Sequence, residues 1–136
     1  MHEDNNPKTK LGKLKVPMHL IPPVAKIHLA LALENGAQKY GAYNWREEKI
    51  STTVYIAAMQ RHIDAYLDGE DLAEDSHVHH LAHAMACCAL ILDGEACQQL
   101  IDDRPPRGRA AEMQKQAQKE QRLPPGTVIE LDGPLR

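Results

Sequence analysis

Histidines and carboxylates are concentrated between residues 70 and 83. Of the 8 histidines in the chain, His77, His79, His80 and His83 stand in this segment, directly after an acidic run. At helical spacing His79 or His80 shares a face with His83, so two imidazoles and a nearby carboxylate could hold a divalent cation. A solvated, histidine-rich first helical turn is the alternative explanation. The metal ligands expected from this segment are Glu70, Asp71, Asp75, His80 and His83.

Glu34 is a second candidate, because it stands on a stripe of a predicted helix. The stripe consists of Ile27, Leu31, Glu34 and Gln38. On this stripe Glu34 should face neighbouring helices rather than bulk water, where an unpaired carboxylate is costly. A salt bridge to Arg61 or Lys39 is one solution. The other is a divalent cation, held by Glu34 and Gln38 together with carboxylates of another helix, that bridges the oxygens of a polyphosphate.

Cationic and aromatic side chains near the same helix ends are suited to a nucleotide. Lys39, Arg46 and Arg61 would grip a triphosphate together with a metal. Trp45 is the single Trp of the chain and stands in a loop, where a base can stack on its ring. Asn44 beside it either reads a base edge or a sugar hydroxyl or, like most loop Asn residues, forms a turn. The expected substrate contacts are Lys39, Tyr40, Asn44, Trp45, Arg46, Arg61 and His62.

Helices are the elements that must position these residues. Apolar residues make up 43% of the chain, but with no Phe and 4 Tyr the core has to come from aliphatic side chains, as is typical of packed helices. Periodicity and the positions of Pro and Gly predict three main helices, a short fourth, a polar helix and one strand, at residues 23–40, 51–68, 77–92, 95–101, 109–122 and 127–131. We therefore predict an all-α helical bundle with a short C-terminal strand.

Composition divides the chain into three parts. Residues 1–15 are polar and are expected to form a flexible arm, residues 16–102 hold the catalytic helical domain, and residues 103–136 form a polar helix and a Pro/Gly-rich extension. Three helices of this length bury only part of their apolar faces, and the polar fourth segment invites a partner. We expect a homo-oligomer, either a dimer or a tetramer.

Composition also excludes several classes of protein. No apolar run is long enough to span a bilayer or to act as a secretory signal, so we expect a cytoplasmic protein, in the host cytoplasm if a phage encodes it. The 16 basic and 19 acidic residues give a formal charge of −3, so no direct nucleic-acid binding is expected. The 3 cysteines encode neither a disulfide framework nor a paired zinc site.

Six short blocks stand in a fixed order within residues 16–95. They are residues 34–41 (ENGAQKYG), 44–46 (NWR), 61–62 (RH), 69–71 (GED), 75–76 (DS) and 80–84 (HLAHA). This ordered set resembles the phage and bacterial dATP/dGTP diphosphohydrolase group, within the all-α, MazG-like nucleoside triphosphate pyrophosphohydrolases. The resemblance implies metal-dependent hydrolysis of purine deoxynucleoside triphosphates between the α- and β-phosphates, giving the monophosphate and pyrophosphate. In a phage it implies a supply of dGMP for 2-aminoadenine nucleotide synthesis.

The metal ligands depart from the pattern of MazG-like proteins, which place an ExxE pair on one helix and an ExxD pair on another. Here Gln38 follows Glu34 in place of a second carboxylate, and His80 and His83 stand where ExxD is expected. The implied cofactor is a divalent cation, Mg²⁺ or Mn²⁺. Imidazole ligands would favour Mn²⁺ or Co²⁺ over Mg²⁺.

The residues expected to carry catalysis are Glu34, Lys39, Arg61 and Asp75. Carboxylate-bound metal would polarise the α-phosphate and activate water, while Lys39 and Arg61 neutralise developing charge. Two other interpretations remain open. An HD-type triphosphohydrolase would need an adjacent His-Asp pair, for which residues 62–64 (HID) are the nearest match. A non-enzymatic protein would bind metal through the histidine cluster without hydrolysing any nucleotide.

Overall fold

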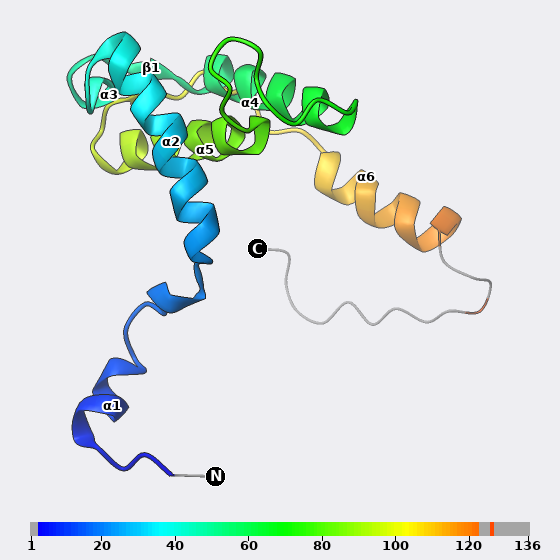
Figure 1. Ribbon diagram of the computed structural model, residues 1–136. Coiled ribbons are helices and arrows are strands. Elements are labelled where there is room, and N and C mark those ends of the chain that lie inside the picture. The colour runs from blue at the N-terminus through cyan, green and yellow to red at the C-terminus, as the bar shows by residue number, and fades with distance from the viewer. Residues whose placement is uncertain (1–2, 123–125, 127–136) are drawn as a thin grey trace. The chain divides into compact units, whose positions relative to one another are not determined.

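Helices dominate the described chain (Figure 1), which in the computed structural model comprises residues 3–122 and residue 126. Residues 1–103 and 104–136 form two compact units. The first contains α1 (Pro7–Gly12), η1 (Met18–Leu20), α2 (Pro23–Tyr40), α3 (Asn44–Glu47), β1 (Ile50–Ser51), α4 (Thr52–Leu67), α5 (His80–Ala96) and β2 (Leu100–Ile101). The second contains α6 (Ala110–Ala117) and the π-helix η2 (Gln118–Arg122). The predicted all-α fold is confirmed, and the strand predicted at 127–131 lies outside the described residues.

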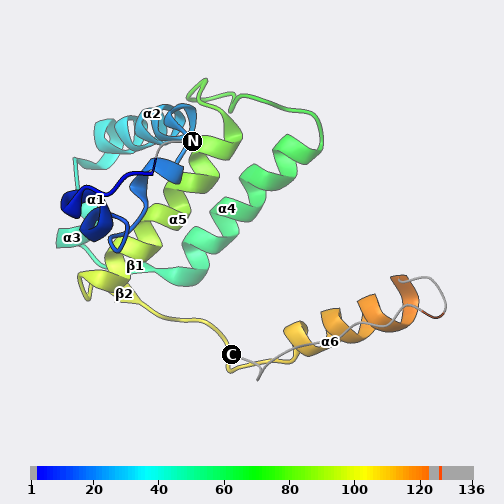
Figure 2. The same cartoon turned by 90° about the horizontal axis from the view of Figure 1, so that it is seen from below.

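Helices α2, α4 and α5 form the bundle of the first unit. Figure 2 shows α4 and α5 side by side, and α2 packs against α5. Helix α2 begins at Pro23, whose missing N–H is no loss in a first turn, and is followed by Gly41 with a φ of 91°. Helix α4 begins at Thr52, where the carboxylate of Asp103 accepts hydrogen bonds from the N–H and the hydroxyl of Thr53, at 2.8 and 2.6 Å. The predicted bounds of both helices are confirmed to within a residue.

Helix α5 begins later than predicted. His77 has a φ of 59°, in the left-handed region, so the helix cannot run through it. The ring of His79 caps the helix, because its Nδ1 accepts a hydrogen bond from the N–H of Leu81 at 3.0 Å. The cluster is thereby divided: His77 and His79 belong to the loop, and His80 and His83 belong to the helix.

The same helix also ends later than predicted, at Ala96. Gly94 lies inside it and is buried against Ile50, where an added Cβ would stand 3.6 Å from the Ile50 Cδ1 atom. After α5 the chain returns as β2, which pairs in parallel with β1 so that Leu100 stands opposite Ile50. The helix predicted at 95–101 is therefore wrong, because its residues form the end of α5, a turn and β2.

Small side chains form the packed interior of the bundle. The buried apolar residues are Ala32, Ile50, Ala73, Ala82 and Ala84. In contrast, Ile27 and Leu31 are 61% and 44% exposed, and Glu34 and Gln38 are exposed as well. The expectation that this stripe faces neighbouring helices is wrong for the single chain. Ala32, rather than a larger side chain, is the buried residue of α2, and Ile27 and Leu31 point outward.

Outside the bundle the described chain forms short helices. Helix α1 was not predicted, and the Asn6 side chain caps it by accepting a hydrogen bond from the N–H of Lys8 at 2.9 Å. Helices α6 and η2 confirm the polar helix predicted at 109–122. Within residues 3–122 no helix combines the length and the apolar character that crossing a bilayer requires.

A pair of Ala→Leu substitutions tests which face of α2 is packed. Ala32 is 4% exposed, so the added methylenes of Ala32→Leu should overpack the interior and lower the free energy of unfolding by about 1–3 kcal/mol. Ala30 is exposed on the same helix, and Ala30→Leu, the matched control, should change that energy by less than about 0.5 kcal/mol. Denaturant unfolding measures both values. A larger loss of unfolding free energy in Ala30→Leu than in Ala32→Leu would instead place the face of α2 that carries Ile27 in the core.

Candidate active site

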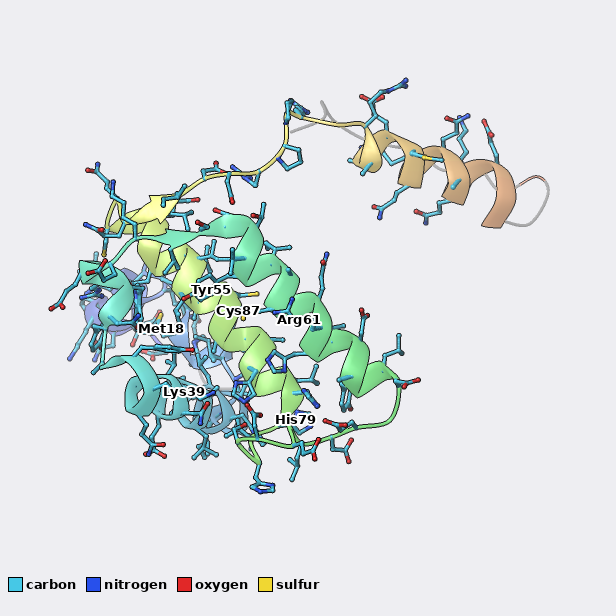
Figure 3. The ribbon with its side chains drawn as sticks, turned by 90° about the horizontal axis from the view of Figure 1, so that it is seen from above. Met18, Lys39, Tyr55, Arg61, His79 and Cys87 are labelled. Atoms are coloured by element: carbon cyan, nitrogen blue, oxygen red, sulfur yellow. The ribbon has the colours of Figure 1, made fainter. Side chains whose placement is uncertain are left out.

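A cavity of about 370 Å³ lies among α2, α3, α4 and α5. Its volume is in the range of small-molecule sites. Small and aliphatic residues such as Ala32, Ala58 and Leu90 form part of its wall. Figure 3 shows how Lys39 of α2, Tyr55 of α4 and Cys87 of α5, all in this wall, are contributed by separate helices. Polar groups far apart in the sequence therefore meet beside an apolar surface.

Several predicted site residues are brought together in this wall. They are Lys39, Tyr40, Asn44, Trp45, His62, Asp75 and His83. Other predicted residues do not line this cavity, namely Glu34, Gln38, Arg46, Arg61, Glu70, Asp71 and His80. Arg61 is exposed on α4, and Lys39 takes the cationic position at the cavity instead.

Three functional groups of the wall were not predicted: Asn35, Tyr55 and Cys87. Asn35 follows the buried Ala32 by three positions and precedes Lys39 by four, so the helical period identifies it once alanine is treated as core. Burial, with smaller contributions from Cys87 and Tyr40, raises the pKa of Tyr55 and keeps it a neutral phenol that can donate a hydrogen bond. Burial is also the main cause that raises the pKa of the Cys87 thiol, which makes it a poor nucleophile.

Lys39 and Asp75 form an open ion pair at this cavity. The Nζ to Oδ2 distance is 3.7 Å, and the two side chains are 48% and 75% exposed. Burial opposes ionisation of Asp75, but hydrogen bonds from the backbone N–H groups of Ser76 and Asp75 itself, and the charge of Lys39, outweigh it and lower its pKa. An ion pair this exposed contributes little to stability. Both charges therefore remain accessible to a ligand.

Three imidazoles meet where α4 approaches the start of α5. Nδ1 of His62 lies 2.9 Å from Nδ1 of His80, and Nε2 of His80 lies 2.7 Å from Oε1 of Glu70. The rings of His62 and His83 stack, with centroids 4.7 Å apart and an interplanar angle of 19°. Nε2 of His83 is 2.8 Å from Oγ of Ser76. Burial is the main cause that lowers the pKa of both His62 and His83, so both rings are largely neutral near pH 7.

The predicted metal ligands do not meet at one point. In residues 3–122, no group of three or more His, Cys, Asp or Glu side chains is placed to hold an ion. Glu34 and Gln38 line a separate cavity of about 340 Å³. No ion pair joins Glu34 to Lys39 or Arg61 in the described part of the chain, and Lys39 pairs with Asp75 instead.

Asp93 of α5 anchors the segment that carries Trp45. Its carboxylate accepts hydrogen bonds from Nε1 of Trp45 at 2.7 Å and from Nε and Nη2 of Arg46 at 2.9 and 3.0 Å. The hydrogen bonds from Arg46 and then Trp45 lower the pKa of Asp93 to about 2. The guanidinium of Arg46 also lies over the ring of Tyr43, 4.7 Å from its centroid. Arg46 therefore holds the loop in place, through a carboxylate that the sequence did not single out.

Comparisons with known proteins give a family match and a curated relative. A family model described as dATP/dGTP diphosphohydrolase, N-terminal, matches residues 5–104. A protein of Salmonella phage PMBT28 named dATP/dGTP diphosphohydrolase is 35% identical over 75 residues, which are 55% of this chain and 25% of that protein. The chain thus spans about a quarter of the length of this relative. No solved structure matches the chain significantly.

Replacing Asp93 by Asn should loosen the anchor of Trp45 and Arg46 and lower the melting temperature near pH 7. The pKa of Asp93 in the folded protein is about 2, below the usual 3.8, so its charge stabilises the fold above about pH 4 and this contribution is lost as the pH falls to about 2. Over this range the wild type should lose more of its melting temperature than Asp93→Asn. The control Glu95→Gln, exposed on the same helix, should follow the wild type. If the melting temperatures of the wild type and Asp93→Asn fell equally over this pH range, the anchoring role of Asp93 would be contradicted.

Proposed function

Because the chain belongs to the family dATP/dGTP diphosphohydrolase, N-terminal, we propose that it hydrolyses dGTP and dATP to the monophosphate and pyrophosphate. The observation that carries the proposal is the cavity whose wall combines the cation Lys39, the carboxylate Asp75 and the aromatic ring of Trp45. These are the groups that phosphates, a divalent cation and a base require. Since the chain spans a quarter of the length of the phage relative, the activity and substrates of the whole protein are part of the proposal.

The purine would bind at the Trp45 end of the cavity. Stacking on the indole ring accepts any base, so selection requires directional hydrogen bonds. The amides of Asn35 and Asn44 and the hydroxyl of Tyr55 are groups of the same wall that can supply them. Tyr55 remains a donor because burial raises its pKa. We assign base recognition to these three side chains.

The triphosphate would lie at the charged side of the same cavity. Lys39 is placed there to neutralise charge on phosphate oxygens as it develops. Arg61, predicted for the same task, is exposed and outside the wall, so the proposal assigns phosphate binding to Lys39.

A divalent cation, Mg²⁺, Mn²⁺ or Co²⁺, fits this side as a partner of the substrate. Mg²⁺ is commonly bound through one or two carboxylates together with water and substrate phosphates. Asp75, which is 75% exposed and lines the cavity, would supply such a carboxylate. Oxygen ligands favour Mg²⁺ or Mn²⁺ over Co²⁺. When bound, the cation would polarise the α-phosphate. Glu70 and His80 bind each other, and the proposal gives them no ligand role.

A homo-oligomer, a dimer or a tetramer, is also part of the proposal. Ile27, Leu31 and Leu92 are 61%, 44% and 67% exposed, and no large side chain among the described residues is fully buried. Covering apolar surface stabilises an assembly by roughly 25 cal/mol per Å². A second copy would supply the cover that the thin interior of one chain lacks.

In a phage, this reaction would supply dGMP for the synthesis of 2-aminoadenine nucleotides. The Salmonella phage relative is named dATP/dGTP diphosphohydrolase, so its name gives both nucleotides as substrates of one protein. An enzyme that acts on both lowers dATP while it forms dGMP, which is the combination that replacement of adenine requires.

Product analysis tests which bond is cleaved. With Mg²⁺ or Mn²⁺, dGTP and dATP should give the monophosphate and pyrophosphate, and in oxygen-18 water the label should appear in the monophosphate because water attacks the α-phosphorus. Chelation should abolish turnover. Release of deoxynucleoside and triphosphate would instead indicate an HD-type enzyme, and metal binding without turnover of any nucleotide would indicate a non-enzymatic metal-binding protein.

Separate substitution of two carboxylates tests which cavity holds the reaction. Asp75→Asn preserves the volume but removes the charge beside the phosphates, so kcat should fall by about 100-fold. Glu74→Gln, at an exposed neighbouring position, is the matched control and should retain wild-type kcat. Glu34→Gln reports on the rival cavity, and a larger loss there than in Asp75→Asn would move the reaction to the Glu34 side.

A further inference from the structure

Large apolar side chains stand uncovered in the α1–η1 segment, residues 7–21. Leu14, Val16 and Leu20 are 83%, 76% and 70% exposed. The remaining large apolar residues of the segment, each at least 42% exposed, are Leu11, Met18 and Ile21. Exposed apolar surface of this extent marks an interaction site. The segment therefore requires a cover that the described part of its own chain does not supply.

A groove of about 710 Å³ lies among α2, α4 and α5, and its wall is apolar apart from the imidazoles of His28 and His79. It shares no residue with the wall of the proposed nucleotide cavity. Its large side chains are Leu29 of α2, Met59 and Ile63 of α4, and Leu81, Met85 and Leu92 of α5. Ile63 and Leu92 are 41% and 67% exposed. The groove is therefore an open apolar surface outside the proposed site of reaction.

Helix α5 presents apolar residues on opposite faces. Cys87 and Leu90 line the nucleotide cavity, whereas Leu81, Met85 and Leu92 line the groove. A helix that is apolar on all sides is normally buried on all sides. We therefore expect the groove face of α5 to be covered in the assembled protein.

Opposite charges accompany the two surfaces. Residues 5–33 contain lysines but no Asp or Glu, and residues 64–75 contain acidic residues but no Lys or Arg. Asp64 and Asp68 stand at the C-terminal end of α4, where the last turn contains no basic side chain, and in residues 3–122 neither carboxylate forms an ion pair. The helix macrodipole makes this end unfavourable for anions and favourable for cations. Lys10 and Lys13 of the α1–η1 segment can supply the missing positive charge.

The connection to α2 favours a second copy over the segment's own chain as the site of docking. Ile21 and Pro22 are extended, with φ and ψ of −78° and 116° for Ile21 and of −60° and 132° for Pro22. Each precedes a proline, which disfavours the helical conformation that a tight turn needs. The chain therefore does not reverse direction where it enters α2, and folding back onto its own groove is disfavoured.

We propose that the α1–η1 segment of one copy lies in the groove of a second copy, and that the exchange is reciprocal. This inference rests on the homo-oligomer of the proposed function and identifies its interface. The apolar side chains of the segment fill the groove, and its lysines face the carboxylates at the end of α4. Because each copy contributes the same segment and the same groove, the exchange closes a dimer with two-fold symmetry.

The test is sedimentation equilibrium of the full chain without nucleotide, which measures the dissociation constant of the dimer. Leu20→Glu places a charge in the segment and Leu92→Glu places one in the groove, at positions that are 70% and 67% exposed in the single chain. Each should raise the dissociation constant by about 100-fold or more, because a buried charge without a partner is costly. Ile63→Glu is a second groove variant and should act alike. Met113→Glu, 72% exposed on α6, is the matched control and should keep the wild-type constant, and circular dichroism should show wild-type helix content in every variant.

Mixing two variants tests whether the contact is made between copies. A dimer of one Leu20→Glu copy and one Leu92→Glu copy retains one unaltered segment in one unaltered groove, whereas a dimer of either variant alone retains none. The mixture should therefore associate about 10-fold or more tightly than either variant alone. A segment that occupied its own groove would give no such rescue.

The outcomes separate this inference from the proposed function. Unchanged dimerisation of Leu20→Glu or Leu92→Glu, or a mixture no tighter than its components, would overturn this inference alone and place the dimer interface elsewhere. A wild type that stays monomeric would overturn the homo-oligomer of the proposed function and this inference with it. Hydrolysis of dGTP by that monomer would leave the proposed reaction standing.

Discussion

The buried alanines of α2 and α5 decide where the polar side chains of the bundle lie. Ala82 is fully buried and Ala32 and Ala84 nearly so, which makes small residues the interior of the bundle. Small side chains let helices approach closely, and overpacking them is costly. Larger side chains such as Ile27 are consequently turned outward, while the polar residues between the alanines are left to line a cavity. The thin interior and the cavity therefore have one cause.

Both ends of α5 are tied to other elements by a carboxylate. Near its end, Asp93 accepts the hydrogen bonds of Trp45 and Arg46 and so fixes the aromatic side of the cavity. At its start, His80 is hydrogen-bonded to Glu70 and to His62, which fixes the imidazole side. The proposed division of labour follows from this arrangement, with base recognition at the Trp45 side and phosphates beside Lys39.

Local signals predicted the main helices but not which of their faces would be packed. Pro23 and Gly41 bound α2 correctly, because capping depends on residues close in sequence. The packed face of α2 was predicted to carry Ile27 and Leu31, because large apolar side chains give the strongest helical periodicity. The buried face instead carries Ala32, and which face is buried depends on the neighbouring helix as well as on α2 itself. Lys39 and Trp45, which are close in sequence and were predicted to contact one substrate, line the same cavity. The pairing of Arg46 with Asp93 spans 47 positions, and no local spacing encodes it. The metal assignments stay predictions.

The central claim is that the nucleotide occupies the cavity among α2, α3, α4 and α5. A crystal structure of the protein with α,β-methylene-dGTP and Mg²⁺ tests it most directly. The account predicts the purine against Trp45 and phosphate oxygens within hydrogen-bond distance of Nζ of Lys39. A nucleotide seated instead in the cavity of Glu34 and Gln38, with the His62 side empty, would contradict it.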